Sequence, residues 1–170
     1  MLALWLLDKY FKTFYTLSMN ILLLIQTVVF ISYVGLIIKR YGILPSISDS
    51  WYSLPQSENF LFTLFTWGLA IPMLFYGNVW FFLAGVGLSF VGAATQFKMT
   101  LGLTSEIHYA GAVLGIFSSL IGIASMYQDL FPLVNFVFFA LVLQLSPIKN
   151  KLWWQEILAF AVILLGLMVH

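Results

Sequence analysis

Long apolar runs separated by short polar connectors limit what this sequence can fold into. A helix needs about 20 mostly apolar residues to cross the roughly 30 Å hydrocarbon core of a bilayer. The run over residues 13–38 has this length, with Asn20 and Gln26 as its strongly polar side chains, and it ends at Lys39 and Arg40. The sequence therefore predicts a membrane-spanning helix in this region.

The composition agrees with a bilayer environment. Hydrophobic residues make up 62% of the chain and charged residues 8%, against roughly 45–50% and about 25% in soluble domains. Seven Lys and Arg with six Asp and Glu cannot provide a polar surface for a 170-residue protein in water. The net charge of +1 gives no electrostatic basis for nucleic acid as a partner. The absence of Cys excludes disulfides, thiolate metal ligands and a Cys nucleophile.

Pro, Gly, Asn and charged residues divide the remaining sequence into five further apolar helices. Asn59 is expected to cap the second span and Pro72 to kink it. Glu106 lies at the positive end of the fourth span, and Pro132 lies in the first turn of the fifth. We expect an all-α integral membrane protein, a single domain over residues 1–170 built as a bundle of six transmembrane helices. The expected spans are 13–38, 59–76, 79–96, 106–126, 130–145 and 152–169.

The distribution of Lys and Arg predicts the orientation of the bundle. Six spans place both termini on one side and the loops 39–58, 97–105 and 146–151 on the other. Five of the seven Lys and Arg lie in these loops, and two, Lys9 and Lys12, precede the first span. Because Lys and Arg near span ends favour the cytoplasmic side, we expect the loops to face the cytoplasm. The opening segment MLALWLLDKYFK is expected to be a short interfacial segment, since its Lys residues follow the apolar run instead of preceding it as in a signal peptide.

Small residues recur every four positions in the third and fourth spans. Gly85 and Ser89 share one helix face in the third span, and Gly111 and Gly115 share one in the fourth. Small side chains let helix backbones approach closely, and dispersion contacts then hold the helices together. We expect the two spans to pack on each other through these faces. The high frequency of Gly in membrane helices is the alternative explanation, and oligomerisation through Gly111 and Gly115 is a related one.

The expected spans offer little intramembrane chemistry. Their middles lack Asp, Glu, Lys, Arg and His, which argues against an ion-coupled transporter. Glu156 lies one turn into the last span, near the interface. The chain has two histidines, too few for a zinc site built mainly from His. A mixed site of His108, Asp49 and Glu58 or Glu106 stays open, but we expect no metal and no cofactor.

Polar and charged side chains gather at one predicted membrane face. They are Ser48, Asp49, Glu58, Lys98, Glu106 and His108. Such a cluster above an apolar bundle suits a lipid headgroup or another ligand, whereas turn and helix capping by Asp49 and Glu106 is the structural alternative. Ser48, Asp49 and His108 are also the residue types of a serine-hydrolase triad, a pattern that is recognised by geometry and not by residue type.

Three segments carry a resemblance to a known family. They are LPSISDSWYSLPQSENFLF, GVGLSFVGAATQF and EIHYAGAVLGIF, in this order over residues 44–117. They resemble the family that groups the damage-regulated autophagy modulators (DRAM) with FGF-receptor-activating-protein, GPI-lipid-remodelling and yeast Sfk-like membrane proteins. The resemblance implies a six-helix bundle with both termini on one face and a role in lipid handling. In the eukaryotic family the corresponding first loop lies on the exoplasmic or lumenal side.

From these features we expect a multi-pass membrane protein that binds or organises membrane lipids through a polar pocket at one membrane face, without catalysis. One alternative is a membrane-embedded lipid hydrolase or remodelling enzyme that uses His108 and Asp49, with Ser48. A second alternative is a structural subunit of a larger membrane complex or a homo-oligomer, a role that suits short loops and 18% aromatic residues.

Overall fold

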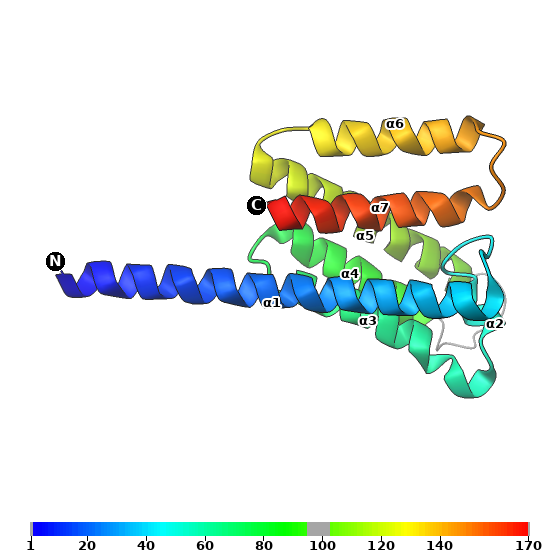
Figure 1. Ribbon diagram of the computed structural model, residues 1–170, viewed down its shortest axis with the longest axis horizontal. Helices are drawn as coiled ribbons and strands as arrows, with labels where there is room; N and C mark the ends of the chain where they lie inside the picture. The colour runs from blue at the N-terminus through cyan, green and yellow to red at the C-terminus, as the bar shows by residue number, and fades with distance from the viewer. Residues whose placement is uncertain (1, 95–102, 170) are drawn as a thin grey trace.

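The computed structural model describes residues 2–94 and 103–169, and within these residues the regular elements are all helical, without strands (Figure 1). This confirms the predicted all-α class. The helices are α1 (Leu2–Tyr41), α2 (Ser50–Ser53), α3 (Phe60–Met73), α4 (Val79–Ala94), α5 (Leu103–Tyr127), α6 (Phe131–Leu145) and α7 (Lys151–Val169), with a 3-10 turn η1 at Gln56–Glu58.

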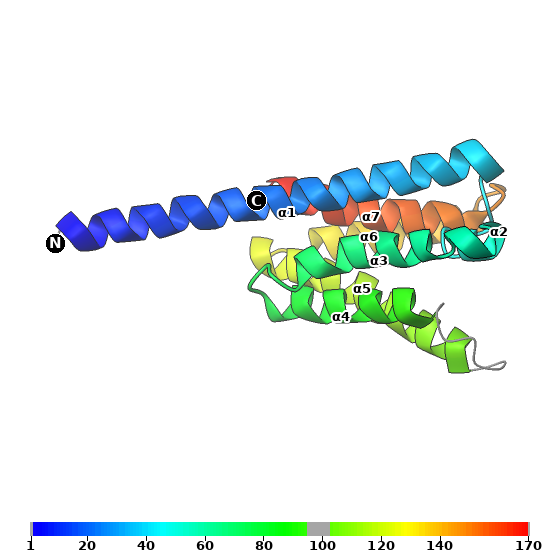
Figure 2. The same ribbon diagram turned by 90° about the horizontal axis from the view of Figure 1, so that it is seen from below.

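The first helix is longer than the sequence predicted. It runs without interruption for 40 residues, a length of about 60 Å at 1.5 Å per residue, and its N-terminal part projects beyond the other helices (Figures 1 and 2). The segment before residue 13 is helical and continuous with the rest of α1, and its placement at the interface stays a prediction. No Pro or Gly occurs before Gly35, so nothing in the sequence breaks the helical hydrogen-bond ladder.

Three helical segments are long and apolar enough to cross a membrane: Leu17–Tyr41, Glu106–Tyr127 and Lys151–Val169. The apolar helices Val79–Ala94 and Phe131–Leu145 are shorter. Large apolar side chains are exposed on most of the helices, including Leu24, Phe82 and Phe138. A surface of this kind is compatible with a lipid environment, because water would penalise it strongly.

The helices lie side by side, with both termini toward one end and the connections 42–59 and 146–150 at the other (Figures 1 and 2). Helix α4 packs between α3 and α5, and α7 contacts α1, α5 and α6. Helix α6 lies at the edge, where Phe136 is its one buried side chain. The loop end therefore brings together segments that are far apart in the sequence.

Helices α4 and α5 approach each other at glycine positions. A Cβ atom on Gly87 would lie 2.6 Å from the Gly115 nitrogen and 2.7 Å from the Gly111 oxygen. These neighbours are backbone atoms that cannot move aside, so only Gly fits at this crossing. The predicted packing of these two helices through Gly111 and Gly115 is present in the structure.

The partner of this α5 face on α4 is Gly87 and not the predicted face of Gly85 and Ser89. A Cβ atom on Gly85 would meet Leu74 and the Ala70 oxygen of α3, at 2.7 and 2.8 Å. The Ser89 carbonyl accepts a hydrogen bond from Trp67 Nε1 on α3 at 3.2 Å. Helix α4 therefore uses two small-residue faces, one for each neighbour, because it packs between both.

A buried polar network joins α1 to α3. Gln26 Nε2 donates to the Leu69 carbonyl at 2.7 Å, and the Tyr76 hydroxyl donates to Gln26 Oε1 at 2.5 Å. Gln26 is fully buried and Tyr76 is nearly so. Both ends of the Gln26 amide thus have partners, as buried polar groups require.

The start and end of α3 differ from the expected cap and kink. Asn59 has helical φ and ψ and makes no side-chain cap; its amide instead faces the backbone carbonyls of Trp51, Leu54 and Pro55. Pro72 lies in the last turn of α3, which ends at Met73. Pro therefore coincides with the end of this helix instead of kinking its middle, because the proline ring disrupts the preceding turn.

Candidate functional site

The segment between α1 and α2, residues 42–49, folds back over the loop end of the bundle; we call it the 42–49 loop. The backbone N–H of Trp153, which is fully buried, donates to the Pro45 carbonyl at 3.1 Å. Asn150 Nδ2 donates to the Ile43 carbonyl at 2.8 Å. The start of α7 therefore anchors this loop across the end of the helices.

Glu156 attaches the same loop from inside the bundle. Its carboxylate accepts hydrogen bonds from the Ile47 backbone N–H and from Ser48 Oγ, the latter at 3.2 Å. The side chain is largely buried, and no Lys or Arg in the described residues pairs with it. Two carboxylate oxygens offer about four acceptor positions. Glu156 therefore keeps acceptor capacity beyond its bonds to the loop.

A small cavity lies beneath the 42–49 loop. It is partly enclosed and has a volume of about 30 Å³, with most of its lining from α3, α4, α5 and α7. Ser48 and Glu156 lie on its wall together with Thr66, whose hydroxyl bonds to carbonyls of its own helix. The cavity is therefore apolar except where Ser48 and Glu156 meet.

Three phenylalanines, Phe62, Phe65 and Phe160, form the aromatic wall of the cavity. Two α1 rings support this wall: Tyr33 stacks on Phe65 with ring centroids 4.2 Å apart, and Phe30 lies 5.2 Å from Phe160. Packing between rings on three helices fixes the orientation of each ring. The wall is thus a rigid part of the core.

Some of the predicted site residues come together here. Ser48 lines the cavity, and Asp49 lies close enough to interact electrostatically with both His108 and Glu156. His108 is mostly buried, near the Val91 carbonyl and 6.4 Å from the Phe62 ring. These residues share one end of the bundle, as the sequence predicted, but the His108 ring lies outside the cavity lining.

The other predicted site residues do not join this group. Glu58 forms an exposed ion pair with Arg40. Glu106 is exposed in the first turn of α5. Lys98 lies outside the described residues. Within the described residues, no group of three or more His, Asp and Glu could hold a metal ion.

The residue types of a serine-hydrolase triad do not form its hydrogen-bond chain in this structure. Ser48 Oγ donates to Glu156, and the ring of His108 is near a backbone carbonyl of α4. A general base must reach the proton that it removes, directly or through one water. The hydrolase alternative therefore has no geometric support here and stays a prediction.

Sequence reasoning missed Glu156 as a site residue. The residue lies 109 positions from its partner Ile47, and no local motif connects the two. One signal was present: Glu156 is the single ionisable residue of the last apolar run after its opening Lys. Its position one turn into a membrane-length helix predicts a place at the interface, whereas in the structure the 42–49 loop folds down to meet it.

No protein-family model, curated protein or solved structure matches this chain. The resemblance described above therefore stays a prediction, and the function must be argued from the site itself.

Proposed function

We propose that this chain is a six-crossing membrane protein that holds the polar end of a membrane lipid in the cavity beneath the 42–49 loop, without catalysing a reaction on it. The observation that supports this most is the cavity itself. It is apolar and aromatic on most of its wall and carries Ser48 and Glu156 at one place. Ligand sites commonly combine an apolar lining with a few polar groups that fix orientation.

The arrangement of the shorter helices supports six crossings. Helices α3, α4 and α6 have 14, 16 and 15 residues, or about 21–24 Å at 1.5 Å per residue. They lie alongside the three membrane-length helices (Figure 1). The flanking turns supply the remaining length, and a locally thinner bilayer accommodates short spans at modest cost.

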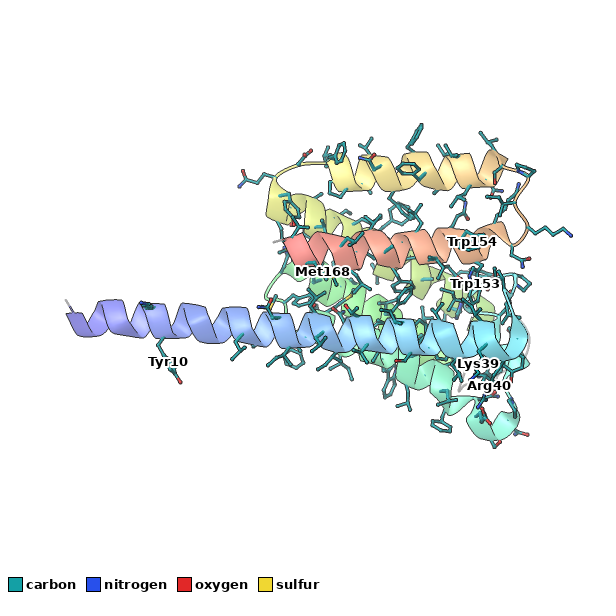
Figure 3. All side chains as sticks on the ribbon, viewed as in Figure 1. Tyr10, Lys39, Arg40, Trp153, Trp154 and Met168 are labelled. Atoms are coloured by element: carbon teal, nitrogen blue, oxygen red, sulfur yellow. The ribbon has the colours of Figure 1, made fainter. Side chains whose placement is uncertain are left out.

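The position of the cavity suits a headgroup. Lys39 and Arg40 lie at the same end of the bundle as Trp153 and Trp154 (Figure 3). Basic and Trp residues concentrate at the boundary between lipid and water. The cavity lies just inside this boundary, at the depth where a lipid headgroup meets its chains. By the charge distribution, this end faces the cytoplasm.

Filling the cavity tests the lipid-binding proposal. Ala112 lines the cavity, whereas Ala110 is exposed on the same helix. We expect Ala112→Phe to reduce the amount of lipid that stays bound to the purified protein in native mass spectrometry, and Ala110→Phe to leave it unchanged. Equal lipid retention by the two variants and the natural protein would contradict the proposal.

Single cysteines test the crossings and the orientation, because the natural chain contains none. Ser57→Cys lies in the loop end, and Asp129→Cys lies in the connection between α5 and α6 at the opposite end. In intact cells a membrane-impermeant thiol reagent should label Asp129→Cys and not Ser57→Cys. Labelling of Ser57→Cys alone would reverse the orientation, and labelling of both would reject the six-crossing arrangement.

A further inference from the structure

We infer that the group received by this cavity is a protonated primary amine, an inference that rests on the proposed lipid-binding function. The amine can belong to a lipid headgroup or to a free soluble amine, since both present the same ammonium group. The carboxyl groups, the size and the hydrogen-bonding capacity of the cavity support this assignment.

Two carboxyl groups meet at the polar corner, and no Lys or Arg of the described residues forms an ion pair with Glu156. Glu156 lines the cavity, and Asp49 is close enough to interact with it. Arg40, at the same end of the bundle, is paired with Glu58. A buried carboxylate without a cationic partner is costly, and an ammonium group of a ligand would offset that cost.

The size and wall of the cavity select among cations. Its volume of about 30 Å³ holds one or two water-sized groups. A primary ammonium has this size, whereas a trimethylammonium carries three methyl groups more. The rings of Phe62, Phe65 and Phe160 on the wall add favourable cation–π contacts for a positive group near their faces.

The free hydrogen-bonding positions match a donor-only ligand. A primary ammonium has up to three N–H donors and no acceptor. Glu156 interacts with the Ile47 N–H and with the hydroxyl and N–H of Ser48, which leaves about one of its four acceptor positions for a ligand. Ser48 Oγ gives its hydrogen to Glu156, which leaves the oxygen's lone pairs as acceptors. Both polar lining groups can therefore accept from the ligand.

The test compares matched lipids on the natural protein in native mass spectrometry. Phosphatidylethanolamine carries the primary ammonium, phosphatidylcholine carries the trimethylated one, and N-acetyl-phosphatidylethanolamine lacks the positive charge. With identical acyl chains, we expect phosphatidylethanolamine to bind at least about tenfold more tightly than the other two, the range of a charged hydrogen bond. Equal binding of all three lipids would overturn the amine assignment.

Variants locate the preference within the protein. Glu156→Gln should reduce the preference for phosphatidylethanolamine to about twofold or less. Glu58→Gln, a carboxylate at the same end but outside the cavity lining, should keep the full preference. If Glu156→Gln does not fold, the lipid series on the natural protein still decides the assignment. An unchanged preference in a folded Glu156→Gln protein would overturn it.

Two further arms separate the remaining outcomes. Butylamine should displace phosphatidylethanolamine if a free amine is the ligand, and should fail to do so if the lipid's own chains are needed. Lipid binding that Ala112→Phe removes, with no headgroup preference in the natural protein, would reject the amine and retain the proposed function. Lipid binding that Ala112→Phe leaves intact would reject both.

Discussion

Two adjacent positions on α5 face very different surroundings. Gly111 touches the backbone of α4 at Gly87, where no further atom fits. Ala112 lies next to it in the sequence and lines the cavity. Helix α5 thus contacts the α4 backbone directly at Gly111 and leaves an open space beside Ala112, on a neighbouring face. Small residues close an interface when a backbone faces them, and they open a cavity when side chains hold the neighbouring helices apart.

The two buried polar centres, at Gln26 and at Glu156, also differ in how fully they are enclosed by the protein. Gln26 has partners at both ends of its amide, Leu69 and Tyr76, and is fully buried. Glu156 bonds to the loop and also lines the cavity with acceptor capacity left. The Gln26 centre is complete within the protein, which fits a structural role, whereas the Glu156 centre lines the cavity of the proposed ligand site.

The largest effect is expected at the glycine contact. Gly87→Leu would place a side chain against the backbone of α5 and should lower the free energy of unfolding by about 3 kcal/mol or more. Gly35→Leu is the matched control, since a Cβ atom there meets nothing within 4 Å. Equilibrium unfolding in mixed micelles measures both. A similar loss in the two variants would show that the contact is not tight.

Removal of the acceptor at Glu156 should have the next largest effect. Glu156→Leu leaves the Ile47 N–H without its partner, at a cost of about 2 kcal/mol. The loss should be local, so hydrogen exchange is expected to accelerate at Ile47 and Ser48 and to stay unchanged at Leu69. Faster exchange throughout α3 would instead mean that Glu156 supports the whole bundle.

Removal of one hydrogen bond from the Gln26 centre should lower the free energy of unfolding by a smaller amount. Tyr76→Phe deletes the hydroxyl that donates to Gln26, and interhelical hydrogen bonds in membrane proteins contribute about 1 kcal/mol. Unfolding in mixed micelles should show this loss, and lipid retention in native mass spectrometry should be unchanged. A change in lipid retention would contradict the assignment of a purely structural role to the Gln26 centre.

The smallest effect is expected at the exposed ion pair of Arg40 and Glu58. Both side chains are accessible, and exposed pairs contribute little to stability. Glu58→Gln should therefore leave thermal unfolding in detergent unchanged. A clear loss of stability would show that this pair contributes more than an exposed ion pair.

The sequence predicted the helices better than the site. Apolar run length located α4 through α7 closely, because helix boundaries in a bilayer follow from the positions of charge, Pro and Gly. The same rule located the apolar run of α1 but not the start of the helix at Leu2, since the helix continues through the charged residues before the run. The sequence predicted that Ser48, Asp49 and His108 lie at one end of the bundle, because the number of helices between two residues determines which end each one occupies. The cavity and Glu156 were not predictable, because both depend on how a loop packs against a distant helix.

Cysteine protection at the cavity tests the central claim most directly. In the natural cysteine-free background, Ala112→Cys places a thiol in the cavity wall and Ala110→Cys places one on the exposed side of α5. Added phosphatidylethanolamine should slow modification of Ala112→Cys by a small methanethiosulfonate reagent, and should leave the rate for Ala110→Cys unchanged. Modification of Ala112→Cys at the same rate with and without the lipid would contradict the account.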